Sequence, residues 1–165
     1  MTPTTPLTLH RETVRPEWID YNGHMNVAYY LLAFDHATDA VLDRFGIGKA
    51  YVVAENRSVF VVDAHLTYAR EVTEGTALRF ESLLLGADAK RLHLFHEMRH
   101  AEEGWLAATA EVMLLHVDLG TRKTSPFPSG VAAALAEQAA AHAGLPRPPQ
   151  AGRAVARLDG SRAAG

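Results

Sequence analysis

The sequence predicts an α+β domain in which an antiparallel sheet of about five strands wraps around one long helix. The first observation behind this prediction is a single long run of apolar residues at helical spacing, from Val27 to Phe45. The second is a series of four strand-like patterns after it, the last three separated by turns short enough for hairpins. A long antiparallel sheet must bury one face, and this helix is the candidate to cover it.

The segments before the helix follow from local patterns. Residues 1–6 are rich in threonine and proline, and we expect them to be flexible. Leu7 to Val14 alternate in polarity, which predicts a first strand, and Pro16 ends it. Asn26 is suited to cap the helix, because its side-chain oxygen can accept hydrogen bonds from the first turn. Gly46 is suited to end it.

The segments after the helix are mostly strands. The apolar run 51–53 predicts a short strand or the start of one. Four longer strands are expected at Ser58 to Tyr68, Thr76 to Leu85, Arg91 to His100 and Trp105 to Val117. Ser129 can cap a last, alanine-rich helix over 130–143. Residues 145–165 have no periodicity and predict a mobile C-terminal tail, which leaves 7–144 as the folded domain.

Composition excludes several classes of protein. The 165 residues suffice for one domain, and 16 basic against 19 acidic residues give a net charge of −3, so no nucleic-acid partner is expected. No apolar run approaches the length of about 20 residues that spans a bilayer, and the first residues lack the pattern of a signal peptide. We therefore expect a cytoplasmic protein that does not bind membranes.

Nucleophile and cofactor motifs are missing from the sequence. There is no cysteine, and no serine lies in a Gly-x-Ser-x-Gly frame. No phosphate-binding loop or dinucleotide fingerprint occurs, so we expect no cofactor. His96 and His100 share a strand face but lie about 13 Å apart, and Asp35, His36 and Asp39 are expected to form a solvated helix face. We therefore predict no metal site.

The residues with the clearest chemical pattern lie just before the helix. Asp20, Asn22 and His24 occupy a short loop that leads into the helix N-terminus. Unpaired N–H groups at that end favour negative charge, either on a bound anion or on an oxygen that becomes charged during a reaction. Aspartate, asparagine and glycine are also ordinary turn and capping residues. It is the combination with an imidazole that favours a functional site.

This motif, Asp20-x-x-Gly23-His24-x-Asn26-x-x-x-Tyr30, resembles that of the hotdog-fold acyl-CoA thioesterases of the 4-hydroxybenzoyl-CoA thioesterase type. Val14 and Pro16 before it, and Thr67-Tyr68 and Arg70-Glu71 before Gly75, extend the resemblance over roughly residues 7–120. It implies the hotdog fold and hydrolysis of a small or medium acyl-CoA. It also implies a homodimer or a dimer of dimers, in which both chains build each site.

The resemblance also implies roles for individual residues. Asp20 would be the catalytic carboxylate, as nucleophile or general base, and the Val27 N–H would polarise the thioester carbonyl. Asn22 and His24 also match plant acyl-carrier-protein thioesterases, so which of the three residues does the chemistry stays open. The candidates for substrate binding are Gly23, Asn26, Tyr30, Thr67, Arg70 and Arg91. Aromatic residues cluster about the motif and would line the acyl site or form a cage for a cationic group; they are Trp18, Tyr21, Tyr29, Tyr30 and Phe34.

Two alternatives to hydrolysis remain. Hotdog enoyl-CoA hydratases carry a similar motif, Asp-x-Asn-Pro-x-His, but there the aspartate and histidine lie five residues apart. Asp20 and His24 are four apart, which favours hydrolysis. A non-catalytic acyl-CoA-binding module would share most of the sequence, but it would not need a carboxylate beside a helix N-terminus.

Overall fold

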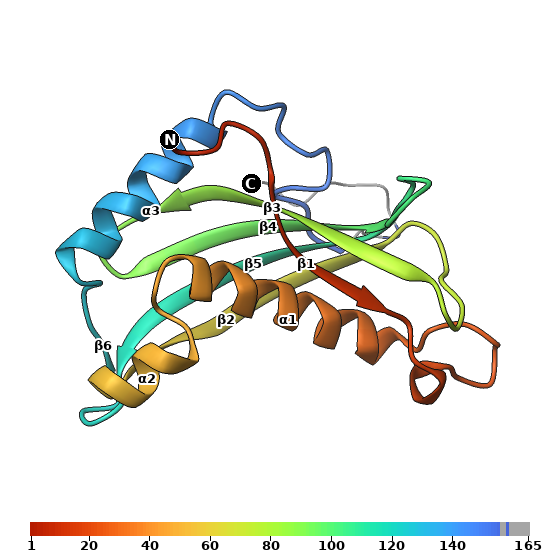
Figure 1. Ribbon diagram of the computed structural model, residues 1–165, viewed down its shortest axis with the longest axis horizontal. Helices are drawn as coiled ribbons and strands as arrows, with labels where there is room; N and C mark the ends of the chain where they lie inside the picture. The colour runs from red at the N-terminus through yellow and green to blue at the C-terminus, as the bar shows by residue number, and fades with distance from the viewer. Residues whose placement is uncertain (156–157, 159–165) are drawn as a thin grey trace.

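The computed structural model describes residues 1–155 and 158 and shows a curved sheet with helix α1 (Val27–Arg44) lying across one face (Figure 1). The strand order in the sheet is β1-β3-β4-β5-β2, all neighbours are antiparallel, and β6 pairs with β5. The strands are β1 (Leu7–Thr13), β2 (Arg57–Tyr68), β3 (Ala77–Ala87), β4 (Arg91–His100), β5 (Leu106–Asp118) and β6 (Lys123–Thr124). The predicted hotdog arrangement is confirmed.

Helix α1 begins and ends where its sequence signals lie. The Asn26 side chain accepts a hydrogen bond from the Ala28 N–H (3.0 Å), and Gly46 takes a left-handed conformation with φ +70° after the last turn. The buried face of the helix recurs every three or four residues and includes Phe34, whose ring meets that of Phe80 edge-on at 5.8 Å. The helix therefore fills the curve of the sheet, as predicted.

The prediction of a strand at residues 51–53 is wrong, because they lie in a short helix, α2 (Lys49–Glu55). Three apolar residues in a row fit either a strand or a helix, so their periodicity carries no information. Gly48 starts the first turn by accepting a hydrogen bond from the Tyr51 N–H, and Asn56 ends the helix in a left-handed conformation (φ 50°). This left-handed residue turns the chain into β2.

The last helix, α3 (Ser129–His142), packs against β3, and its N-cap differs from the prediction. Pro128 occupies the N-cap position, and Ser129 is the first helical residue without a capping hydrogen bond from its side chain. Proline fixes φ, here at −52°, in a range compatible with the extended conformation that a helix start requires. The short strand β6 was not predicted, since two residues carry no pattern.

The predicted flexible N-terminus and mobile tail stay predictions. Pro3 accepts a hydrogen bond from the Gln138 side chain of α3 (2.7 Å), and the Gly152 N–H donates to Glu111 on β5 (2.6 Å). Residues 156–157 and 159–165 of the predicted tail lie outside the described residues. No helix in the described part of the chain is long and apolar enough to cross a membrane.

One fully buried polar group links α1 to the sheet. His96 on β4 has no exposed surface, its Nε2 lies 3.1 Å from Thr38 Oγ1 on α1, and its Nδ1 lies 2.7 Å from Ser82 Oγ on β3. Burial lowers the pKa of His96 from 6.5 to about 4. The imidazole is therefore neutral wherever the protein is folded near neutral pH.

This buried histidine should make the fold acid-sensitive. Below pH 6.5 the unfolded chain gains a proton on His96 that the folded chain takes up only near pH 4, so the free energy of unfolding falls through this range. The total loss from this group is on the order of 3 kcal/mol. We expect His96→Gln to remove most of this pH dependence in urea unfolding measured at neutral pH and near pH 5. His65→Gln, on the half-exposed β2 histidine, is the control and should retain it.

Candidate functional site

The motif before α1 forms a tight hairpin. The Asp20 N–H donates to the His24 carbonyl (3.1 Å), and the Gly23 N–H donates back to the Asp20 carbonyl (3.0 Å). Gly23 adopts φ +82°, a left-handed conformation that residues with side chains rarely tolerate. Because of this turn, the side chains of Asp20, Asn22 and His24 are gathered at one place beside the helix.

Two backbone hydrogen bonds fix the hairpin to the rest of the protein. The Asn26 N–H donates to the carbonyl of Trp18 (2.8 Å), which lies buried in the short 3-10 helix η1 (Pro16–Trp18). The Met25 N–H donates to the Val72 carbonyl (2.8 Å), so the segment after β2 lies against the motif. That contact brings Glu71 to within 3.7 Å of the His24 imidazole, as measured from Oε2 to Nε2.

The carboxylate and the helix N-terminus face the same space. Asp20 is half-buried, and its Oδ1 accepts a hydrogen bond from the Asn22 N–H (2.8 Å), which orients the group. The Asn26 cap takes the Ala28 N–H, whereas the Val27 N–H donates to no acceptor among residues 1–155 and 158. A free N–H at the positive end of a helix is suited to stabilise a developing oxyanion.

An open pocket of about 490 Å³ contains these groups. The predicted site residues that line it are Asp20, Asn22, His24, Asn26, Val27, Tyr30 and Arg70. Gly23 shapes the hairpin beside it. Thr67 hydrogen-bonds Thr109 on β5 and does not line the pocket.

Arg91 is a predicted substrate-binding residue that lies far from the pocket of Asp20 within one chain. It pairs in register with Leu115, whereas Tyr68 beside the pocket pairs with Ala108, seven positions back along β5. At 3.3 Å per residue these positions are about 23 Å apart. Arg91 instead forms an ion pair with Asp88 (2.6 Å) in the β3–β4 turn.

Two aromatic rings from different elements form one wall of the pocket. Tyr30 of α1 and Tyr68 of β2 meet edge-on with ring centroids 5.1 Å apart. Burial raises the pKa of both hydroxyls, and for Tyr30 the nearby Tyr68, Glu71 and Asp20 raise the pKa further. Both phenols are therefore neutral at physiological pH, so their ring faces present negative electrostatic potential without a formal charge.

Tyr68 and Glu71 were not among the predicted site residues, although the stretch 67–71 contributed to the family resemblance. Of the five aromatic residues predicted to surround the motif, only Tyr21 and Tyr30 line the pocket. Trp18 stacks on Tyr29 at 5.5 Å, and Phe34 is in the core. Tyr68 is the last residue of strand β2 and is distant from the motif in the sequence, so only the fold brings it to Tyr30.

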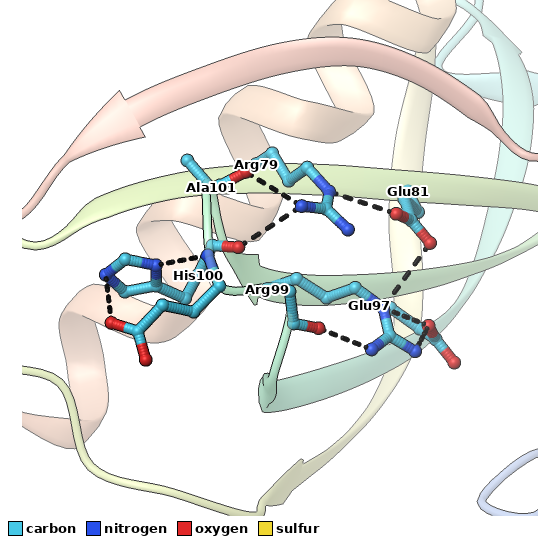
Figure 2. A network of polar contacts seen from close by, with 8 residues as sticks. Arg79, Glu81, Glu97, Arg99, His100 and Ala101 are labelled. Carbon is cyan, nitrogen blue, oxygen red and sulfur yellow. Dashed lines mark hydrogen bonds and ion pairs between the residues drawn. The ribbon is translucent and has the colours of Figure 1, made fainter.

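Arg70 is held at the pocket by a neighbouring turn. Its guanidinium lies over the Trp105 ring, 4.1 Å from the centroid. Figure 2 shows how the turn before Trp105 is fixed, because Arg79 donates to the Ala101 carbonyl (2.8 Å) while Glu81 and Glu97 pair with Arg79 and Arg99. The network fixes the turn that leads to Trp105, and Trp105 in turn positions Arg70. Arg70 is therefore a positioned cation suited to contact a phosphate.

The antiparallel sheet curled around one long helix is the hotdog fold, and the Asp20 carboxylate and the N-terminus of that helix line one pocket on it. Residues 14–135 match the model of the thioesterase-like superfamily, and the chain belongs to this family. It is an acyl-CoA thioesterase, which hydrolyses the thioester to free acid and coenzyme A.

Two relatives and one solved structure are similar to this chain over most of its length. The betainyl-CoA thioesterase of Pseudomonas aeruginosa is 40% identical over 149 residues, which are 90% of this chain and 94% of that protein. The L-carnitine dehydrogenase/betainyl-CoA thioesterase of Rhizobium meliloti is 41% identical over 150 residues, but this chain spans only 30% of its length. A Staphylococcus aureus protein solved in complex with CoA has a TM-score of 0.84 and 28% identity, covering 93% of this chain and 97% of that one.

Proposed function

We propose that the substrate is betainyl-CoA or an acyl-CoA with a similarly small cationic acyl group, and that Asp20 supplies the catalytic carboxylate. The observation that carries the proposal is the shared pocket of Asp20, the free Val27 N–H and two tyrosine rings. The names of the relatives from Pseudomonas aeruginosa and Rhizobium meliloti support the choice of acyl group.

The proposed chemistry uses few groups. The Val27 N–H stabilises the oxyanion that forms when the thioester carbonyl is attacked. Asp20 either attacks the carbonyl itself, giving an anhydride that water then hydrolyses, or takes a proton from the attacking water. The C–S bond breaks, and the thiolate of coenzyme A leaves and is protonated. Asn22 and His24 orient the water or fix the loop, and Glu71 lies close enough to position His24.

The pocket is suited to a quaternary ammonium group. Such a cation has no N–H to donate, so it is recognised by ring faces and by nearby negative charge rather than by hydrogen bonds. Tyr30 and Tyr68 supply the rings, and Glu71 supplies a carboxylate beside them. Arg70, held over Trp105, is the proposed contact for a phosphate of coenzyme A.

We also propose a homodimer, or a dimer of dimers, that forms through the edge of β2. This strand ends the sheet, and Phe60 and Val62 on it are 41% and 53% exposed. Val27 and Leu31 of α1 are 58% and 46% exposed. An unpaired, apolar strand edge is a template for pairing with a second chain. The cytoplasmic location and the lack of a cofactor or nucleic-acid partner stay predictions.

The role of Asp20 is tested by Asp20→Asn. The amide keeps the shape of the loop but removes the charge, so kcat should fall by a factor on the order of 10² to 10⁴ while the fold persists. Release of coenzyme A, followed with a thiol-reactive dye, is the measurement, and the protein adds no thiol background. Asp35→Asn, an exposed carboxylate on α1 outside the pocket, is the matched control. His24→Ala should keep partial activity, whereas a hydratase would need both groups. A folded Asp20→Asn variant with parental turnover would exclude the mechanism.

The acyl group is tested by a matched pair of substrates. Betainyl-CoA has a quaternary nitrogen where the neutral tert-butylacetyl-CoA has a carbon atom. The ratio of their kcat/KM values therefore measures the effect of the positive charge. We expect the cationic substrate to be favoured on the order of tenfold. Tyr68→Leu should remove most of this preference, and Tyr68→Phe, which keeps the ring, should retain it. Equal kcat/KM values for the two substrates would contradict a cationic acyl group but not hydrolysis.

The assembly is tested by a charge on the β2 edge. Val62→Glu should convert the oligomer to monomers in light scattering at micromolar concentration, because a carboxylate would be buried in the new sheet contact. Val53→Glu, on an 82% exposed position of α2, should leave the oligomer intact. A parent protein that is monomeric and fully active would show that one chain suffices.

A further inference from the structure

Three side chains with metal-binding atoms meet on the side of the sheet that faces α1, away from the pocket of Asp20. His10 and Glu12 lie two residues apart on β1 and so point to the same face, and His36 comes from the middle of α1. β1 runs along α1, as Figure 1 shows. One nitrogen of each imidazole and a carboxylate oxygen all lie within 4.8 Å of one another.

The distances are close to those of a filled coordination shell. Glu12 Oε2 lies 3.2 Å from His10 Nε2 and 2.9 Å from His36 Nδ1. Ligand atoms about 2.1 Å from a tetrahedral ion stand about 3.4 Å apart, so each nitrogen would move only a few tenths of an ångström from Oε2 around one. The two nitrogens lie within 4.8 Å of each other. A nitrogen of each imidazole lies near the same carboxylate oxygen, Oε2 of Glu12. An ion held by the three residues would therefore be bound by this oxygen.

The neighbouring groups hold the three ligands in place. The His10 ring packs against Phe80 of β3 with centroids 5.1 Å apart. Arg15 Nη2 lies 3.3 Å from the other carboxylate oxygen of Glu12, Oε1, which His36 Nδ1 also approaches, at 3.2 Å against 2.9 Å for Oε2. Side-chain exposures of 24% for His10, 34% for His36 and 8% for Glu12 show that solvent reaches the imidazoles while the carboxylate is covered. An ion could therefore enter from the imidazole side.

We propose that His10, Glu12 and His36 bind a divalent transition-metal ion, zinc above all, and that this ion joins β1 to α1. Two imidazoles and one carboxylate are a well-matched donor set for zinc with a fourth position open to water. The prediction of no metal site considered ligands only within one strand or one helix, whereas these three residues come from both β1 and α1. The proposal is independent of the proposed substrate, since none of the three residues lines the pocket of Asp20.

Direct binding to the untagged protein tests the site. We expect chelator competition and calorimetry to show one zinc ion per chain and a higher Tm in its presence. His10→Gln, Glu12→Gln and His36→Gln should each weaken binding by more than the roughly 10- to 100-fold that changes in outer-shell residues cost. The matched control is His93→Gln, because His93 pairs with Glu111 at 2.8 Å on other strands and belongs to no such group of three among the described residues. It should bind zinc like the parent.

A second measurement on the parent protein covers the case in which a variant fails to fold. Cobalt(II) in the zinc position should give the absorption of a four- or five-coordinate imidazole complex. It should also broaden the NMR signals of His10 and His36 but not those of His93. Two results would overturn the proposal. One is the absence of stoichiometric binding, and the other is binding that His93→Gln weakens as much as the triad variants do, which would indicate adventitious surface binding.

Discussion

The N-terminus of α1 can stay open to a substrate because the rest of the helix is fixed against the sheet. Burial of a large apolar side chain such as Phe34 contributes about 2 kcal/mol, and α1 buries several of them. The Asn26 cap contributes about 1 kcal/mol more by satisfying the Ala28 N–H. These contributions offset the cost of leaving the Val27 N–H without an acceptor in the part of the chain that the structure describes, and the helix need not fray to find one.

The same fixed helix explains why the site is built from three separated segments. The hairpin of Asp20 cannot move independently, because Asn26 is bonded to Trp18 and Met25 is bonded to Val72. The bond to Val72 also determines where the chain leaves β2, and therefore where Tyr68, Arg70 and Glu71 lie. A change in the packing of α1 would thus alter the positions of the carboxylate, the aromatic wall and Arg70 together.

What the sequence predicts well is local. The bounds of α1, its cap and the grouping of Asp20, Asn22 and His24 depend on residues that are neighbours in the chain, and the structure agrees with them. The helix at 49–55 was missed because its apolar run is shorter than one period. Tyr68 beside Tyr30, and His36 beside Glu12, are contacts between elements distant in sequence. They depend on strand register and on how α1 lies across the sheet, and no local pattern encodes either.

The two edges of the sheet differ in a way that bears on both proposals. β1 presents charged and polar side chains, with Glu12 in contact with His10, Arg15 and His36. Such an edge resists pairing with another strand, and a metal ion there would fasten it to α1 instead. β2 presents Phe60 and Val62 to solvent and has no partner on its outer side among the described residues. Because burying apolar groups is favourable and burying unpaired charges is not, a second chain should add at β2 and not at β1. The pocket of Asp20 borders the end of β2, so the partner that joins there would also approach the site.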